Sequence, residues 1–149
     1  GGCVSRLMTQ VRERRGLSYS VYSQFAPGLH AGAFTIGLQT RPDQALLYRL
    51  SGDKNPLHSD KQFSDVGGFP KPILHGLCTY GFTGRALLHT LCGSDPSRFT
   101  GMDARFSSPV LPGEALTVRM WADGPGKAIF QTLGGDGRVV IDNGGCTFT

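Results

Sequence analysis

The chain has 149 residues, of which 39% are hydrophobic and 17% are charged, and its formal charge is +4. This length fits one ordinary domain, and the apolar runs are too short to span a bilayer, so we expect no membrane partner. The positive balance suits an anionic ligand. However, the basic cluster of Arg12, Arg14 and Arg15 lacks the interleaved aromatic residues of a stacking platform, so we expect no nucleic-acid partner.

Metal-binding and nucleotide-binding motifs are absent from the sequence. The four cysteines, at positions 3, 78, 92 and 146, show no CxxC spacing and fit neither a zinc site nor a dense disulfide framework. His30, His75 and His89 show no ligand spacing, and the HExxH, G-x-S-x-G, Walker and Rossmann patterns do not occur. We therefore expect free thiols and no metal site.

Helical and strand patterns alternate in the first part of the chain. Apolar residues at helical spacing predict a helix over 4–15. The segment 32–40 alternates and is partly β-branched, which predicts a strand. The segment 42–52 has a proline at its start and a glycine at its end, and this pattern predicts a short helix.

The second part of the chain predicts a long helix followed by a meander. Residues 75–91 are apolar on most sides, which predicts a buried helix. Period-two patterns follow, separated by hairpin signals at 123–126 and 134–137. The paired glycines Gly144 and Gly145 weaken the last strand or force a bulge. An antiparallel sheet wrapped around one central helix buries both, so the fold class predicted is α+β.

The motif GDKNPLHSD, residues 52–60, places Asp53 and His58 five positions apart. Pro56 blocks a helix there and biases Asn55 toward extended geometry, so we expect a rigid, non-helical segment. A carboxylate and an imidazole around one water molecule are a common means of positioning and deprotonating it. A solvated loop, with an Asx-turn at the aspartate and a surface histidine, explains the same residues.

Gly76 stands at the start of the predicted long helix, where the helix dipole is positive. A glycine lets a ligand approach the backbone closely, so its N–H is placed to hold an oxyanion. Ordinary helix initiation explains a lone glycine equally well. Together with Asp53 and His58, this amide suggests the addition of water to a carbonyl-conjugated alkene such as an enoyl thioester.

A family resemblance over residues 41–149 is carried by "QALLYRLSGDKNPLHSD", "GGFPKPILHGLCTYGFTGRALL" and "SRFTGMDARFSSPVLPGEALTVRMW". These stretches closely resemble the MaoC-like (R)-specific enoyl-CoA hydratases. The resemblance implies a hot-dog fold and the reversible hydration of trans-2-enoyl-CoA to (3R)-3-hydroxyacyl-CoA, without cofactor or metal. By position it implies that Asp53 and His58 are the catalytic pair, that Asn55 supports the motif, and that Gly76 donates to the oxyanion.

A second resemblance covers the first forty residues, "SRLMTQVRERRGLSYSVYSQFAPGLHAGAFTIGLQTRPDQ". They are similar to a non-catalytic segment of the pitrilysin and mitochondrial-processing metallopeptidases, in which the counterparts of Arg12 and Tyr19 contact peptide. The zinc motif is missing, so peptidase activity is not implied. The chain therefore resembles a chimera of a peptidase-like segment, 1–40, and a hot-dog hydratase domain, 41–149, with 32–40 supplying the first strand.

The resemblance also implies partners. The related hydratases usually carry two hot-dog repeats per chain, so a single repeat implies a homodimer acting on an acyl-CoA thioester. The alternatives are a non-catalytic chimeric or fragmentary hot-dog protein that dimerises and binds acyl thioesters, and a peptide-binding remnant built on 1–40. The first residues lack a signal-peptide h-region and the last, CTFT, are not a peroxisomal tripeptide. We therefore expect a cytoplasmic location, or a peroxisomal one in a eukaryote.

Overall fold

The computed structural model describes residues 21–26 and 33–149. The elements, in chain order, are β1 (Val21–Ala26), β2 (Ala33–Gln39), α2 (Gln44–Tyr48), η2 (Arg49–Ser51), η3 (Pro56–His58), α3 (Lys61–Val66), α4 (Gly76–Cys92), η4 (Pro96–Arg98), β3 (Phe99–Phe106), β4 (Ala115–Ala122), β5 (Lys127–Leu133) and β6 (Val139–Phe148). The helix predicted at 4–15 lies outside the described residues. No helix within the described ranges is long and apolar enough to cross a membrane.

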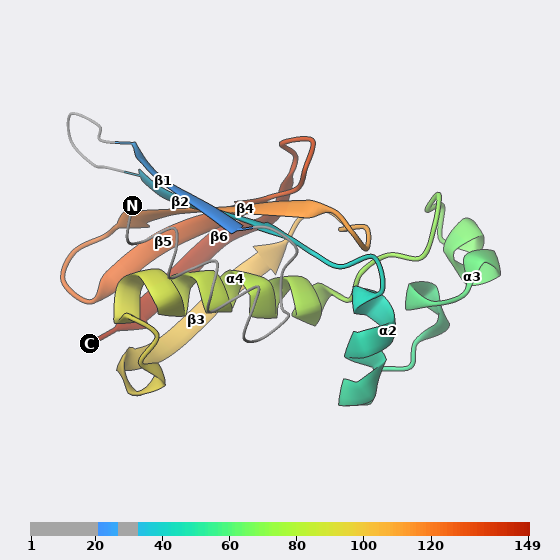
Figure 1. Cartoon of the computed structure of the whole chain (residues 1–149), viewed down its shortest axis with the longest axis horizontal. Coiled ribbons are helices and arrows are strands. Elements are labelled where there is room, and N and C mark those ends of the chain that lie inside the picture. The colour runs from blue at the N-terminus through green and yellow to red at the C-terminus, as the bar shows by residue number, and fades with distance from the viewer. Residues whose placement is uncertain (1–20, 27–32) are drawn as a thin grey trace.

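The strands of the described ranges form one antiparallel sheet in the order β1-β2-β4-β5-β6-β3. Helix α4 runs along one face of this sheet (Figure 1). The hairpin turns between β4, β5 and β6 fall at the predicted positions, and Gly124, Gly126 and Gly137 adopt the positive φ that these turns need. The prediction of an α+β hot-dog fold, an antiparallel sheet around a central helix, is confirmed.

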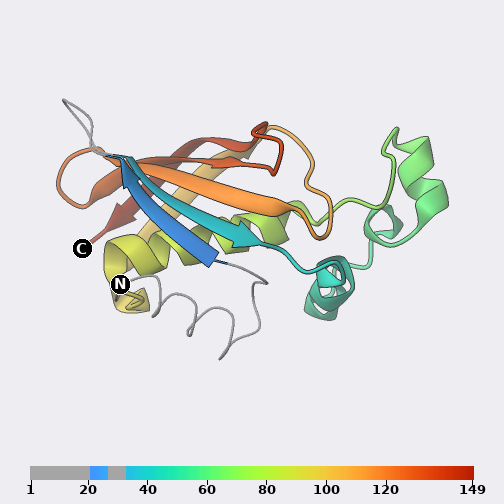
Figure 2. The ribbon, with the colours of Figure 1, turned by 45° about the horizontal axis from the view of Figure 1, so that its top comes forward.

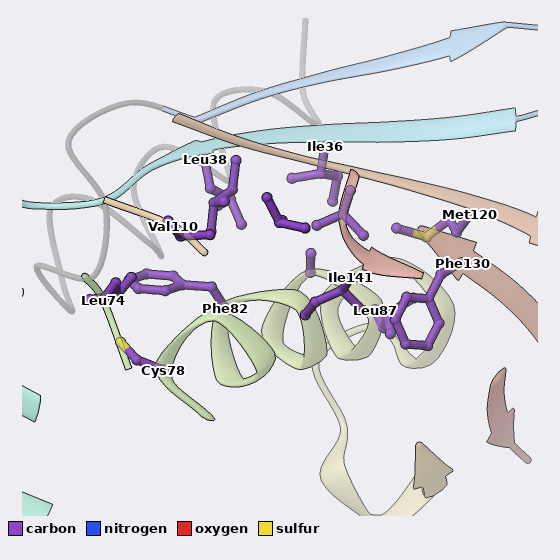
Figure 3. Close-up of a cluster of buried hydrophobic side chains, with 14 of the residues drawn as sticks. Ile36, Leu38, Leu74, Cys78, Phe82, Leu87, Val110, Met120, Phe130 and Ile141 are labelled. Atoms are coloured by element: carbon purple, nitrogen blue, oxygen red, sulfur yellow. The ribbon is translucent and has the colours of Figure 1, made fainter. Parts of the chain in front are cut away.

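The hydrophobic core lies between α4 and the sheet (Figure 3). Every second residue of β4 is buried, as the period of a strand requires when one face meets a core. Residues from several strands meet the buried face of the helix, among them Ile36, Met120, Phe130 and Ile141 from the sheet and Phe82 and Leu87 from α4. Each such side chain stabilises the fold by about 1.5–3 kcal/mol, which fixes α4, and with it Gly76, against the sheet.

The sequence predicted that α4 is buried on nearly all sides, and this is wrong for one face. The buried residues follow each other at helical spacing, as in Cys78, Phe82 and Ala86. The opposite face carries Leu77, whose side chain is 63% exposed, and the exposed Gly81. The apolar surface of this face is therefore not covered by the sheet.

The last strand contains the bulge that its paired glycines predicted. The register of β6 shifts against β5 between Phe130 and Thr132 and against β3 between Asp103 and Arg105. A Cβ at Gly144 would lie 2.5 Å from the Phe130 ring. Only a residue without a side chain fits there, so the glycine allows β6 to pass the aromatic core residue.

Two parts of the fold were not predicted. β1, which pairs with β2, was missed. The segment 53–72 was predicted to be irregular, but it holds the 3-10 turn Pro56–His58 and the helix Lys61–Val66. Proline is excluded from helix interiors but suits the first position of a helix, where its missing N–H is not needed, so Pro56 starts this turn.

The segment between β2 and α4 extends beyond one end of the sheet. It carries α2 and α3, which lie past the sheet in both views (Figure 1, Figure 2). Thr40 anchors the start of this segment to the sheet, because the Thr40 hydroxyl donates to the Glu114 carbonyl at 2.9 Å and accepts from Gly113 N–H at 3.0 Å. The chain then returns to the sheet at the N-terminal end of α4, and the predicted site residues lie on this excursion.

Candidate active site

Local hydrogen bonds fix the conformation of the 52–60 motif. Asp53 Oδ1 accepts from the Asn55 backbone N–H at 3.1 Å, which is an Asx-turn. Asn55 then caps the 3-10 turn, since its Oδ1 accepts from Leu57 N–H at 3.0 Å and Pro56 follows it directly. The Asx-turn that a simple solvated loop would show is therefore present, and Asn55 orders the chain between the aspartate and the histidine.

His58 is half-buried and is held from outside its own loop. Its Nδ1 lies 2.8 Å from the Ile73 carbonyl oxygen. A carbonyl oxygen only accepts, so Nδ1 carries the proton of the neutral ring. This tautomer leaves Nε2 as the bare nitrogen, which is the atom a general base uses. His58 is therefore not the freely solvated surface histidine that the solvated-loop alternative predicts.

His75 joins this group, and sequence reasoning did not select it. Its side chain is 1% exposed, and its Nε2 lies 3.3 Å from the Asp53 backbone oxygen. The His75 ring stacks on the His58 ring with centroids 3.8 Å apart, while the Tyr48 ring lies 4.5 Å away. Burial, and then the nearby His58, lower the pKa of His75, which favours the neutral form of its ring.

The structure brings the predicted pair together at one point. One side-chain ligand atom from each of Asp53, His58 and His75 lies within 4.8 Å of the others. Two hydrogen bonds of ordinary length through one water span such a separation. The Asp53 side chain is exposed and His58 is half-buried, so solvent reaches the carboxylate directly.

The same three residues fit a metal ion poorly. Zinc binds imidazole nitrogen in the plane of the ring at about 2.0–2.1 Å. The rings of His58 and His75 are inclined by only 28° and stack face to face, so their in-plane lone pairs run side by side and do not converge on one ion. His58 also commits Nδ1 to the Ile73 carbonyl. The arrangement suits a shared water better than a cation.

Gly76 is the first residue of α4 and follows His75 directly. The first N–H groups of a helix have no intrahelical acceptor and point toward the positive end of its dipole. Gly76 is exposed, and a Cβ there would lie 3.4 Å from the Phe106 ring. The glycine thus leaves the amide open, although the space around it also admits a methyl group.

An apolar cleft of about 170 Å³ lies beside this group, and its lining includes Leu38, Gln44, Tyr48, Leu77, Phe82 and Arg85. Tyr48 links the two features, since its ring also contacts His75. A larger hollow of about 440 Å³ is lined by Asp103, Trp121 and Asp142 and contains none of the predicted site residues. The apolar cleft is thus the space that adjoins the candidate site.

Comparisons with known proteins identify two families. The family described as "MaoC like domain" matches residues 29–144, which is most of the chain. The family described as "Peptidase M16 inactive domain" matches residues 1–49. The composite character predicted from the sequence is confirmed, and the two matches overlap over 29–49.

Relatives and a solved structure agree with the first family. "3-hydroxyacyl-thioester dehydratase Y" of Mycobacterium tuberculosis is 54% identical over 79% of this chain and 42% of its own length. "Enoyl-CoA hydratase 2, peroxisomal" of Arabidopsis thaliana is 52% identical over 63% of this chain and 30% of its own length. A MaoC-like dehydratase from Phytophthora Capsici superposes with a TM-score of 0.72 and 32% identity, covering 87% of this chain and 60% of that one.

The chain spans less than half the length of these two curated relatives. The family match itself extends over more than three quarters of the chain and includes Asp53, Asn55, His58 and Gly76. The fold agrees as well, since the dehydratase superposes over 87% of this chain with a TM-score of 0.72. By this match, the chain belongs to the MaoC-like domain family.

Proposed function

We propose that this chain adds water to trans-2-enoyl-CoA to give (3R)-3-hydroxyacyl-CoA, and that it catalyses the reverse dehydration. The observation that carries the proposal is the meeting of Asp53 and His58, within 4.8 Å, beside the N-terminal end of α4. The names of the relatives, a hydratase of enoyl-CoA and a dehydratase of 3-hydroxyacyl thioesters, support the same pair of reactions.

In the proposed reaction, Asp53 and His58 hold one water between them. The bare Nε2 of His58 accepts a proton from this water as its oxygen bonds to C3 of the enoyl group. The electron pair of the double bond moves toward the thioester, and negative charge develops on its oxygen. The electron pair then returns from the oxygen and C2 takes up the proton that His58 Nε2 received, so one water is consumed and both side chains return to their starting state.

Gly76 and Asn55 have supporting roles in this proposal. The Gly76 N–H, at the positive end of the α4 dipole, donates to the thioester oxygen when it carries the developing charge. Asn55 stabilises the turn that places Asp53 and His58 on one side of the loop. The exposed apolar cleft beside Tyr48 is the space available to the acyl group.

Crotonyl-CoA hydration tests the proposal directly. The ultraviolet absorbance of the enoyl thioester falls as water adds, and Asp53→Asn and His58→Gln should each slow this decrease by about 100-fold or more while the protein stays folded. The product is then offered separately to 3-hydroxyacyl-CoA dehydrogenases specific for the (3R) and the (3S) epimer. Oxidation by the (3S)-specific enzyme alone would contradict the stereochemical part of the proposal.

We also propose that the active form is a homodimer. The chain contains one hot-dog unit and covers 42% of the dehydratase relative, and its exposed apolar Leu77 lies on the α4 face that the sheet leaves open. Light scattering during gel filtration should give twice the chain mass. The division into a peptidase-like segment 1–40 and a hydratase domain 41–149 remains a prediction, as does a cytoplasmic or, in a eukaryote, peroxisomal location.

A second candidate function follows from the M16 match over residues 1–49. In this alternative the chain is a fused or fragmentary hot-dog protein that dimerises and binds acyl thioesters without turnover. Saturable binding of crotonyl-CoA in calorimetry, with no loss of enoyl absorbance at high protein concentration, would favour this alternative over the hydratase.

A further inference from the structure

His75 has no role in the reaction proposed above, yet its ring lies at the centre of the site. One face of the ring stacks on His58 at 3.8 Å, and the Tyr48 ring lies 4.5 Å away at an inclination of 42°. His75 is the N-cap of α4 and is 1% exposed. A histidine so completely buried between aromatic rings cannot rotate without moving them, so its position constrains the His58 ring.

The contacts of His75 also define where its proton lies. Nε2 faces the Asp53 carbonyl oxygen at 3.3 Å, and a carbonyl oxygen only accepts. Nε2 therefore carries the proton, and Nδ1, which is buried without a hydrogen-bond partner in the described part of the chain, is bare. The charged and titratable groups around the ring are His58, Asp53 and Arg49, with Tyr48 on the aromatic side.

We propose that His75 is a positioning residue that holds both members of the Asp53–His58 pair from one buried ring. Its Nε2–H fixes the Asp53 backbone, and its face fixes the plane of the His58 imidazole, whose Nδ1 is already tied to Ile73. The inference rests on the proposed function, because it assigns His75 an effect only through these two residues.

The position of His75 explains how one residue can hold both Asp53 and His58. Asp53 and His58 lie on the same loop, but the loop is exposed at Asp53, and its own Asx-turn orders only the local backbone. His75 belongs to a helix whose other side is packed against the sheet, so it transmits the rigidity of the core to the loop. Misplacement of a reacting group by about 1 Å can cost roughly 100-fold in rate.

Two substitutions separate the two contacts of His75. His75→Phe keeps an aromatic ring against His58 but removes the donor to Asp53, whereas His75→Gln keeps an N–H near the position of Nε2 but removes the ring. Each should lower kcat for crotonyl-CoA hydration by about 10- to 100-fold with KM within about twofold. His89→Phe is the matched control, because His89 is a partly buried histidine of α4 that bonds Ser94 away from the site.

A double-substitution cycle tests whether His75 acts through His58. In a His58→Gln background, His75→Gln should cost less than about threefold, because it removes only the ring contact and the His58 ring that this contact positions is gone. Losses that multiply independently would overturn the proposal, and so would a wild-type kcat in both single variants while His58→Gln is inactive. If His58→Gln itself hydrates normally, the proposed function fails first, which is a different outcome.

A measurement on the wild-type protein tests the proposal even if the substituted proteins do not fold. Proton–nitrogen correlation spectra distinguish the two neutral tautomers of a histidine ring. They should show His58 protonated at Nδ1 and His75 protonated at Nε2, as the two carbonyl contacts require. A His75 ring protonated at Nδ1, or at both nitrogens at neutral pH, would contradict the Asp53 contact and therefore the proposal.

Discussion

His58 donates its Nδ1–H to the Ile73 carbonyl oxygen at 2.8 Å, across 15 positions of sequence. This bond selects the tautomer with a bare Nε2 and holds the ring from the segment that enters α4. It therefore connects the loop that carries the candidate base to the helix that carries the candidate oxyanion donor. The chemistry of the site depends on this link between two parts of the chain.

Substitution of Asp53 or His58 tests the role of each in the proposed reaction. His58→Gln removes the base, and Asp53→Asn removes the negative charge of the second side chain that holds the water. Each substitution should therefore lower kcat by about 100- to 10,000-fold. Steady-state hydration of crotonyl-CoA measures the loss, and thermal unfolding checks that both variants fold. His89→Gln serves as the control, and hydration near the wild-type rate in either site variant would reject the assignment.

The backbone amide of Gly76 can be removed without breaking α4. Proline suits the first position of a helix, and His75 already has the extended ψ of 133° that a residue before proline prefers. Gly76→Pro should therefore fold yet lower kcat by about 100- to 1,000-fold, the usual effect of losing one oxyanion donor.

Gly76→Ala is the matched control for the amide. It keeps the N–H, and its methyl group would lie 3.4 Å from the Phe106 ring, which is ordinary contact. Hydration rates of the two variants, corrected for the folded fraction, should differ by at least about tenfold. Equal rates would show that the amide does not contribute to the reaction.

Patterns that repeat within a few residues made much of the sheet predictable. Strands β4, β5 and β6 follow from alternation between glycine-rich turns, because a strand with one buried face requires period two. The short helix Lys61–Val66 was missed because six residues give no readable period, and only the Asp60 cap marks its start. The strand β1 was missed because its residues were read only as part of the peptidase-like segment.

The proximity of the candidate site residues was predictable where they are neighbours in sequence. Asp53, Asn55 and His58 lie on one short segment that Pro56 keeps from forming an α-helix, so their proximity followed from local rules. The contact between His75 and Asp53 crosses 22 positions and depends on how α4 meets the loop. Its one signal in the sequence was that His75 directly precedes Gly76, the residue selected as the oxyanion donor.

Acid stability should depend on Glu114. Burial alone would raise the pKa of this carboxyl, but hydrogen bonds from Arg138 and from the Leu111 and Gly135 amides outweigh it and lower the pKa below its ordinary value of 4.5. A group whose pKa is lowered by folding stabilises the native state above its unfolded pKa. That contribution is lost as the pH falls through the folded pKa.

Glu114→Gln isolates this effect. The variant should be less stable than the wild type by about 2 kcal/mol at neutral pH, since it loses charge-assisted hydrogen bonds at a side chain that is 13% exposed. The difference should begin to shrink as the pH falls below 4.5, and the two proteins should converge once the pH is below the folded pKa. Urea unfolding at a series of pH values measures this, and a difference that persists undiminished at low pH would contradict the ionic origin.

The glycine at position 144 should be far less replaceable than the glycine at position 81. A Cβ at Gly144 would lie 2.5 Å from the buried Phe130 ring. That ring packs in the core of the sheet, so Gly144→Ala should destabilise the protein by about 1–3 kcal/mol through overpacking.

Gly81 lies inside α4 on its exposed face, and a Cβ there meets no heavy atom of the described chain within 4 Å. Gly81→Ala should therefore stabilise the protein by about 0.5–1 kcal/mol, because alanine favours the helix. Chemical unfolding of the two variants, measured in parallel, compares the cost of a steric clash at position 144 with the gain in helix propensity at position 81. A Gly144→Ala variant as stable as the wild type would mean that Phe130 moves aside, and the core around α4 would then be less rigid than the site requires.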